Sequence, residues 1–399
     1  MKKIFLFRLK KKVKIESKWE VKKISQLVSI VRGASPRPIR EYTTDDVNGF
    51  NWIKIGDVKP DSKYITETKE KITKDGSVKS RIVKKGDFIL SNSMSFGRPY
   101  IMEIEGCIHD GWLLLSDFSK ELNKDYLYYM LSDNIVQDQF TSAASGGTSV
   151  DNLNIEKVSH TQIPLPPLDI QQKIVSEIEV LEAKEKKARE EVEKGKKIKH
   201  DTIESYFNKN QDINKLGEIT GFKRGPFGGS LKKEIFVESG FKVYEQQHAI
   251  KNDFSIGRYF ITEEKFEEMK GFELIKGDLI MSCSGTIGKI AVFPDNADKG
   301  IINQALLRFR PKESISITSY LKICLEHITS KFEENSHGTG LKNVASVDIL
   351  KNINVYCPPL SEQQKIVSEI EKIEAKIEVL ETEIAQIPKQ KETILKKYL

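Results

Sequence analysis

Apolar side chains recur in alternate steps of four and three residues along the C-terminal part of the chain. Every step from Ile366 meets another apolar residue, through Ile370, Ile373, Ile377, Leu380, Ile384 and Ile387. A continuous stripe with a mean period of about 3.5 residues is typical of a coiled-coil seam. We therefore predict a long helix over 360–399. Pro388 should kink or interrupt this helix, because proline lacks the amide hydrogen that the helix interior requires.

A weaker stripe with the same steps lies in the middle of the chain. It runs through Ile174, Ile178, Leu181, Ala188 and Val192, and it is interrupted by Glu185 and Gly195. This pattern predicts a second long helix over 168–208. Because the two stripes are equivalent, we expect the helices to pair with each other in antiparallel orientation, related by a pseudo-twofold axis. The alternative is that each helix pairs with a second copy of the chain.

Both predicted helices begin with nearly the same sequence. The two segments are PPLDIQQKIVSEIE (166–179) and PPLSEQQKIVSEIE (358–371), and they share the nine residues QQKIVSEIE. The prolines should end the preceding element, and Asp169 and Ser361 are candidates for the N-cap. Gln172 and Gln364 follow at the spacing of a capping box.

Other segments repeat in the same order, at an offset of about 192 residues. VRGASPRPI matches KRGPFGGSL, KKGDFILSNS matches IKGDLIMSCS, and SGGTSVDNL matches SHGTGLKNV. Short apolar runs between turn residues predict strands, and other segments have helical spacing. We therefore predict an α/β (α+β) fold made as a tandem repeat of two similar globular domains and two helices. The expected boundaries are 1–16 for a basic extension, 17–165 and 210–357 for the domains, and 168–208 and 360–399 for the helices.

The composition indicates a folded and mildly basic protein. The formal net charge is +6 and the pI is about 8.8, which is compatible with a polyanionic partner. The cysteines Cys107, Cys283, Cys324 and Cys357 form no CxxC pair, so we expect neither a zinc site nor disulfides, as in a reducing cytoplasm. No apolar run reaches the length of about 18 residues that a membrane-spanning helix needs.

Candidates for catalytic chemistry are weak. Asp61, Glu67 and Lys69 imitate the acidic residues and lysine of a metal-dependent nuclease, but the acids lie close together and the second half has no equivalent set. The sequence has no GxxxxGK[ST] phosphate loop, no GxSxG nucleophile elbow, no methyltransferase tetrad and no histidine cluster at metal spacing. We expect a chain without a catalytic centre, metal site or cofactor of its own.

Polar loops that occur in both halves are candidates for contacts with nucleic acid. Glycine lets a backbone approach a phosphate, and arginine donates bidentately to guanine or to phosphate. The candidates in the first half are Arg32, Gly33, Ser35, Arg37, Arg40, Ser93, Arg98, Gly147 and Thr148. Those in the second half are Lys223, Arg224, Gly225, Ser230, Lys232, Ser284, Thr286, Lys289, Gly338, Thr339 and Lys342. Each loop alone is better explained as a turn, but their repetition in two bodies indicates two heads that read DNA.

These features together resemble the specificity subunit of type I restriction–modification enzymes, from about Trp19 to Leu399. The motifs that carry the resemblance are WEVKKISQLVSIVRGASPRPI, KKGDFILSNSMSFGRP, ASGGTSVDNLN and IPLPPLDIQQKIVSEIEVLE. Those in the second half are GPFGGSLKKE, IKGDLIMSCSGTIGKIAVF and the second copy of the helix start. The interrupted first stripe, Pro388 and the basic extension depart from an even repeat.

The resemblance implies that each domain recognises one part of a bipartite, asymmetric site in double-stranded DNA, while the helices fix the spacer between the parts. It also implies two modification (methyltransferase) subunits as partners, which use S-adenosylmethionine. Restriction subunits would add ATP- and magnesium-dependent translocation and cleavage, and the chain itself would be non-catalytic. The alternative from another class is a coiled-coil scaffold that assembles proteins without DNA specificity.

Overall fold

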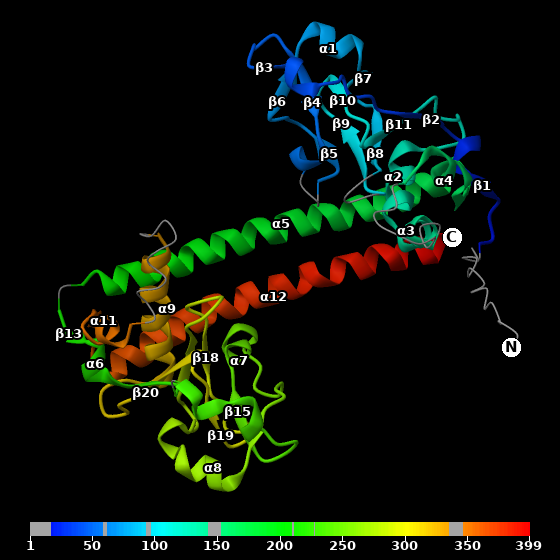
Figure 1. The fold of residues 1–399 in the computed structure, drawn as a ribbon. Coiled ribbons are helices and arrows are strands. Elements are labelled where there is room, and N and C mark those ends of the chain that lie inside the picture. Colours follow the sequence, from blue (N-terminus) through cyan, green and yellow to red (C-terminus); the bar gives the residue numbers. More distant parts are fainter. Residues whose placement is uncertain are drawn as a thin grey trace, which may run out of the picture. The chain divides into compact units, whose positions relative to one another are not determined.

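The computed structural model describes residues 17–58, 62–92, 97–142, 153–209, 211–226, 228–334 and 346–399. The chain divides into two compact units, Met1–Lys187 with Glu383–Leu399, and Ala188–Thr382. Two long helices, α5 (Leu168–Phe207) and α12 (Leu360–Tyr398), each contribute a segment to both units (Figure 1). The prediction of two globular parts carrying two long helices is confirmed.

The globular part of the first unit is built on two five-stranded sheets. One sheet has the order β2 (Ser29–Arg32), β11 (Trp112–Ser116), β8 (Phe88–Ser91), β9 (Pro99–Met102) and β5 (Tyr64–Ile65). The other has the order β3 (Thr43–Thr44), β6 (Glu70–Ile72), β4 (Phe50–Ile53), β10 (Gly106–Ile108) and β7 (Arg81–Val83). A separate antiparallel pair joins β1 (Val21–Lys23) to β12 (Gln162–Pro164). The helices are α1 (Lys74–Val78), α2 (Lys124–Ser132), α3 (Asn134–Ser142) and α4 (Ile155–His160).

The second unit repeats this topology with fewer strands. Its larger sheet has the order β14 (Thr220–Arg224), β20 (Leu306–Pro311), β17 (Leu279–Ser282) and β18 (Ile290–Val292). Its smaller sheet has the order β16 (Phe260–Ile261), β15 (Phe241–Tyr244) and β19 (Gly300–Ile302), and β13 (Ile213–Lys215) pairs with β21 (Asn354–Tyr356). The helices are α6 (Leu216–Ile219), α7 (Gln246–Lys251), α8 (Glu263–Glu268), α9 (Thr318–Glu334) and α11 (Val347–Lys351).

The two units share the order and direction of their equivalent strands. The strands β2, β11, β8 and β9 correspond to β14, β20, β17 and β18, and all neighbours in both sets are antiparallel. In the smaller sheets, the pairs β4–β10 and β15–β19 are both parallel. Because the order and direction of these equivalent strands agree in both sheets, the sequence repeat corresponds to a repeat of this common framework of strands.

The long helices complete the apolar cores of the units. Ile174 and Ile178 of α5 and Leu395 of α12 are buried in the core of the first unit, against α2. Ile366 and Ile370 of α12 are fully buried in the second unit, in a cluster that includes residues of α9. Pro388 was predicted to kink or interrupt α12. The helix is continuous through this residue, so an interruption is wrong.

The start of each long helix is fixed by a buried glutamine. Gln171 and Gln363 have no exposed surface. The Gln171 side chain donates to the carbonyls of Pro166 and Glu121 at 2.7 and 2.8 Å, and it accepts from the Asn123 amide at 2.8 Å. Gln363 makes the same three contacts, with Pro358 (2.8 Å), Ile315 (2.7 Å) and the Ile317 amide (3.1 Å).

The predicted caps of the long helices are wrong. Helices α5 and α12 begin one residue before Asp169 and Ser361, so these side chains lie in the first turn and do not hold the N-cap position. The first glutamine of each QQ pair is buried, whereas Gln172 and Gln364 are exposed. The first glutamine of each QQ pair therefore connects the start of the helix to the globular part by hydrogen bonds. The pair does not form a capping box.

Candidate nucleic-acid interface

The first predicted reading loop begins at Gly33, where β2 ends. The Gly33 amide donates to the Trp112 carbonyl at 2.9 Å. A Cβ atom at this position would lie 2.1 Å from the His109 carbonyl oxygen, a distance that real Cβ atoms do not show. The glycine is therefore explained by the close packing of β2 against the turn before β11, and it needs no phosphate to account for it.

The second predicted loop begins at Gly225 in the same way. The Gly225 amide donates to the Leu306 carbonyl at 3.0 Å, and a Cβ atom there would lie 1.8 Å from the Asn303 carbonyl oxygen. Both glycines thus fix the point at which a loop leaves the equivalent sheet of its unit.

Three predicted residues in or just before the first loop contact Asp110. Ser35 Oγ donates to Asp110 Oδ1 at 2.5 Å, Arg37 Nη2 lies 3.2 Å from Asp110 Oδ2, and Arg32 Nε donates to the Asp110 carbonyl at 2.8 Å. The hydrogen bond from Ser35, aided by the Arg37 charge, holds the pKa of Asp110 below its usual range. No motif in the sequence pointed to Asp110, because it is 75 residues from Ser35 along the chain.

A cavity of about 820 Å³ lies beside this loop. Arg37 and Arg40 line it from the loop, Lys54 and Glu70 line it as an ion pair, and His109 lines it from the turn before β11. Burial lowers the pKa of His109, so its ring is neutral at neutral pH. The last three residues were missed from the sequence, because they share no motif with the loop and only the sheet brings them to it.

The predicted polar residues in and just before the second loop fall into two groups. Lys223 Nζ lies 4.5 Å from the centre of the Phe272 ring, and Arg224 is half-buried, so both side chains are engaged by their own unit. Ser230 and Lys232 are exposed. Among the four, Ser230 and Lys232 are therefore the residues most accessible to a ligand.

The loops after β8 and β17 have the same internal bonding. Ser91 Oγ accepts from the Arg98 amide at 3.1 Å, and Ser282 Oγ accepts from the Lys289 amide at 3.0 Å. The side chains of Arg98 and Lys289 are exposed. Ser284 and Thr286 are exposed as well. The predicted residues Ser93, Gly147, Thr148, Gly338, Thr339 and Lys342 lie outside the described residues.

The predicted seam residues of the long helices are buried or half-buried. In the first unit, Lys397 and Lys391 of α12 pair with Glu177 and Glu182 of α5 at 2.9 and 3.0 Å. As the residue number increases along α5, the residue number of the partner on α12 decreases. These segments are therefore antiparallel.

The segments of α5 and α12 in the second unit are also antiparallel. Tyr206 donates to Glu369 at 2.8 Å, and Lys196 lies 3.2 Å from Glu381. A Cβ atom at Gly195 would lie 2.9 Å from the Ile377 side chain. The gap in the first stripe at Gly195 is thus a place where the helices approach closely.

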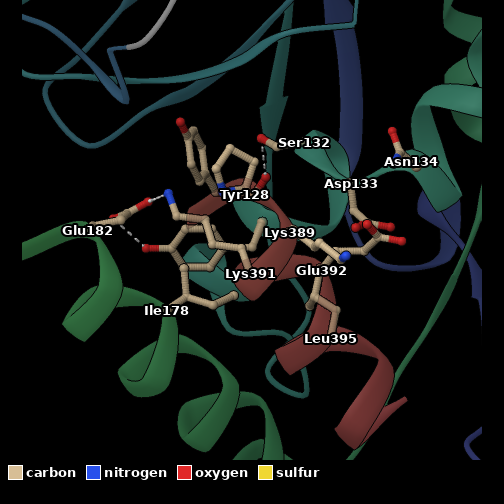
Figure 2. Close-up of a pocket in the computed structure, with 12 residues that line it drawn as sticks. Tyr128, Ser132, Asp133, Asn134, Ile178, Glu182, Lys389, Lys391, Glu392 and Leu395 are labelled. Atoms are coloured by element: carbon tan, nitrogen blue, oxygen red, sulfur yellow. Dashed lines mark hydrogen bonds and ion pairs between the residues drawn. The ribbon is translucent and has the colours of Figure 1, made fainter. Parts of the chain in front are cut away.

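The end of α12 is held against the first unit around a cavity of about 530 Å³. Glu182 of α5 accepts hydrogen bonds from Tyr129 of α2 and from Lys391 of α12, and Figure 2 shows Lys391 pointing toward Glu182. Burial raises the pKa of Asp133 at the rim of this cavity. No predicted DNA-contacting residue lines it, so we interpret it as part of the junction between helices and globular part.

Signs of metal binding or membrane insertion are absent from the part of the chain that the structure describes. No group of three or more His, Cys, Asp or Glu side chains there could hold a metal ion. No helix within the described ranges is long and apolar enough to cross a bilayer. Of the nuclease-like set, Asp61 lies outside the described residues, and Glu67 and Lys69 are exposed.

Comparisons with known proteins agree on one family. The family model for the type I restriction modification DNA specificity domain matches residues 16–194 and again 208–389. The MjaVIII type I specificity subunit of Methanocaldococcus jannaschii is 22% identical, over 96% of this chain and 92% of its own.

Solved structures with similar folds belong to the same systems. The S subunit from M. genitalium is 16% identical, with a TM-score of 0.52 and 98% coverage of both chains. A chain of a type I R-M system, studied for complex assembly, is 18% identical, with a TM-score of 0.60 over 96% of this chain and 98% of its own.

Proposed function

Because this chain belongs to the type I restriction–modification DNA specificity family, we propose that its two units read the two parts of one bipartite, asymmetric DNA site. The chain is a DNA specificity subunit with two recognition domains. One observation carries the proposal of a bipartite site. The loops that begin at Gly33 and Gly225 leave equivalent points of two sheets with the same order of equivalent strands. The scaffolds agree while the loops differ, so the two parts of the site should differ too.

We propose that the exposed loop residues of the two units contact different parts of the DNA site. Arg37, Arg40 and Arg98 of the first unit would contact one part of the site, and Lys232 and Lys289 of the second unit would contact the other. Arginine suits guanine edges and phosphates, whereas lysine acts as a point charge on phosphates and bases. The glycines at the loop origins would position these side chains without touching DNA themselves.

The long helices would set the distance between the two parts of the site. Residues 17–165 and 210–357 are the proposed recognition domains, and 168–208 and 360–399 the proposed spacer. A helix of this length spans about 60 Å at roughly 1.5 Å per residue, which exceeds one turn of DNA of about 34 Å. Shortening both helices by one heptad should change the tolerated spacer length and leave both half-site sequences unaltered.

The proposed partners are double-stranded DNA, two modification subunits and, in the restricting complex, restriction subunits. In this assembly the chain would be non-catalytic and would bind no cofactor of its own. The modification subunits would use S-adenosylmethionine, and the restriction subunits would use ATP and magnesium. The isolated chain should therefore leave DNA intact in the presence of magnesium.

Methylation mapping tests the proposed function. Cells that express the chain with its modification subunits should carry methylated adenines in one bipartite, non-palindromic motif. A scaffold without DNA specificity would give no motif, and its complex would bind duplexes without the steep salt dependence of phosphate contacts. Methylation at unrelated sequences, or none that depends on this chain, would contradict the proposal.

A further inference from the structure

We propose that Asp110 is a positioning residue of the first recognition domain, which holds the loop 33–40 in one conformation before DNA binds. In the described part of the second unit the equivalent position is Gln304, which carries no charge, so the carboxylate that holds the loop belongs to the first unit. This inference rests on the proposed function and adds to it a difference between the two halves.

Asp110 uses all of its polar groups on the loop and its surroundings. Its two carboxylate oxygens hold Ser35 Oγ and Arg37 Nη2, and its amide donates to Ser35 Oγ at 3.3 Å. Its carbonyl accepts from Arg32 Nε at 2.8 Å and from Asn92 Nδ2 at 3.0 Å. Asp110 thereby contacts the residue just before the loop, two residues within the loop, and Asn92, which follows β8.

The turn that carries Asp110 is itself fixed to the core. His109 Nδ1 accepts from the Gly111 amide at 2.8 Å, and the Trp112 amide donates to the His109 carbonyl at 3.1 Å. The Trp112 ring is buried and donates through Nε1 to the Ile53 carbonyl at 3.1 Å. Because the loop 33–40 is bonded to this fixed turn through Asp110, its own motion should be restricted as well.

The charge of Asp110 also changes what Arg37 can do. The Arg37 side chain is 78% exposed, so without a partner it would be free to bind any phosphate within reach. The carboxylate orients the guanidinium and neutralises part of its charge. The lowered pKa of Asp110 keeps this carboxylate ionised throughout the neutral range. Asp110 should therefore favour one geometry at the cognate site and weaken binding to unrelated DNA.

The equivalent turn of the second unit lacks this device. Asn303 Oδ1 accepts from the Ala305 amide at 3.0 Å, as the His109 ring does from Gly111, and Gly225 packs on Asn303 as Gly33 packs on His109. Gln304 therefore occupies the place of Asp110. It is exposed and uncharged, so it cannot neutralise a cation in its loop.

A loop ordered in advance loses less conformational entropy on binding. It also tolerates fewer wrong sequences, because it cannot rearrange to suit them. Asp110 should therefore raise the fidelity with which the first half of the DNA site is read.

The test uses the complex of the full chain with its modification subunits and a randomised duplex library. Wild-type complex and the Asp110→Asn and Asp110→Ala variants are each used to select bound sequences. The same complexes are then titrated with an unrelated duplex at several salt concentrations. Asn keeps the shape and one acceptor for Ser35 but loses the charge that faces Arg37, so its effect should be the smaller of the two.

In both variants we expect discrimination at the first half-site to fall, by roughly tenfold in Asp110→Ala, within the usual cost of a mismatch, while the second half-site is unchanged. Binding to the unrelated duplex should become tighter, and its salt slope should steepen by up to about 0.9, the value of one more phosphate contact. A purely structural role would weaken all binding and would not produce this gain. The matched control, Gln304→Ala, should leave both half-sites as they are.

The possible failures are distinguishable. If the wild-type complex selects no bipartite motif, the proposed function is wrong and this inference with it. If the wild-type motif appears but both variants keep the first half-site intact, Asp110 has no positioning role. Loss of both half-sites together, with a lowered melting temperature, would show that Asp110 only stabilises the fold and would also overturn the inference.

Discussion

The two units agree most closely where they meet the long helices and differ most where their loops leave the sheets. Gln171 and Gln363 make the same three hydrogen bonds, to equivalent backbone groups. By contrast, Asp110 ties down the first loop, whereas Gln304 stands in its place in the second unit. The difference teaches that the contacts between helix and globular part are repeated, while the loops proposed to contact DNA are held differently in the two units.

The largest expected effect tests whether the loop origins are equivalent. Gly33→Ala and Gly225→Ala would each place a Cβ atom about 2 Å from a backbone carbonyl oxygen. Neither the sheet nor the turn can move far, so each variant should destabilise its own unit by about 3 kcal/mol or more. Calorimetry should show one lowered transition in each variant, because the two units need not unfold together.

Gly56→Ala is the control for this pair, since a Cβ atom at Gly56 would meet nothing within 4 Å. It should leave both transitions within about 0.5 kcal/mol of wild type. If Gly225→Ala were as stable as this control, the proposed equivalence of the two loop origins would be wrong.

A second prediction concerns the buried glutamines. Gln171→Ala and Gln363→Ala each remove a buried side chain that makes three hydrogen bonds, one of them buried and two part-buried, at a cost of about 2 kcal/mol or more. The two effects should be similar, because the two sets of contacts are the same. Denaturant unfolding of each variant measures them. The neighbouring exposed glutamines provide the controls: Gln172→Ala and Gln364→Ala should change stability by less than about 0.5 kcal/mol. If Gln171→Ala and Gln363→Ala differed in their loss of stability, the two junctions between helix and globular part would not be equivalent.

The stripe of apolar residues predicted the long helices because a seam depends on local spacing alone. The same reasoning failed at the starts of the helices, because spacing alone cannot show which glutamine of a pair is buried. The burial of Gln171 and Gln363 depends on the carbonyls of Glu121 and Ile315, which are far away in the sequence. Pro388 did not end α12, because a helix already held along its length tolerates one missing hydrogen bond.

The candidate site was predicted only in part for the same reason. The polar loops could be identified from their repetition and their composition. Lys54, Glu70, His109 and Asp110 could not, because the folded sheet alone brings them beside the loop. For the same reason, no local pattern could have shown that Asp110 holds the first loop while Gln304 takes the equivalent place in the second unit.

A third prediction separates the two reading surfaces. Arg40→Ala should weaken binding to the cognate duplex by about 1–2 kcal/mol and relax specificity in one half-site, as loss of a direct base or phosphate contact does. Lys289→Ala should have a similar or smaller effect, confined to the other half-site. Anisotropy titrations with duplexes mutated in one half at a time measure both. If either variant relaxed both half-sites, the assignment of one unit to each half would fail.

The smallest expected effect concerns the helix end in the first unit. Hydrogen bonds from Tyr398 and Lys397 lower the pKa of Glu177. A carboxyl group with a lowered pKa stabilises the fold above its usual pKa of 4.5, and this contribution is lost as pH falls through the lower, folded-state value. Since Glu177 is 38% exposed, solvent screening limits the gain to under about 1 kcal/mol. Glu177→Gln should therefore be slightly less stable than wild type at pH 7, and this difference should shrink as pH falls below 4.5. A difference that does not shrink in acid would contradict this account.

The central claim is that each unit independently reads one half of the DNA site. The most direct measurement is methylation mapping with a chain in which residues 210–357 are replaced by residues 17–165, so that both recognition domains are the first one. The account predicts a methylated motif made of two copies of the first half-site, with the spacer length unchanged. A motif that keeps the original second half-site, or that differs from the first half-site in both parts, would contradict it.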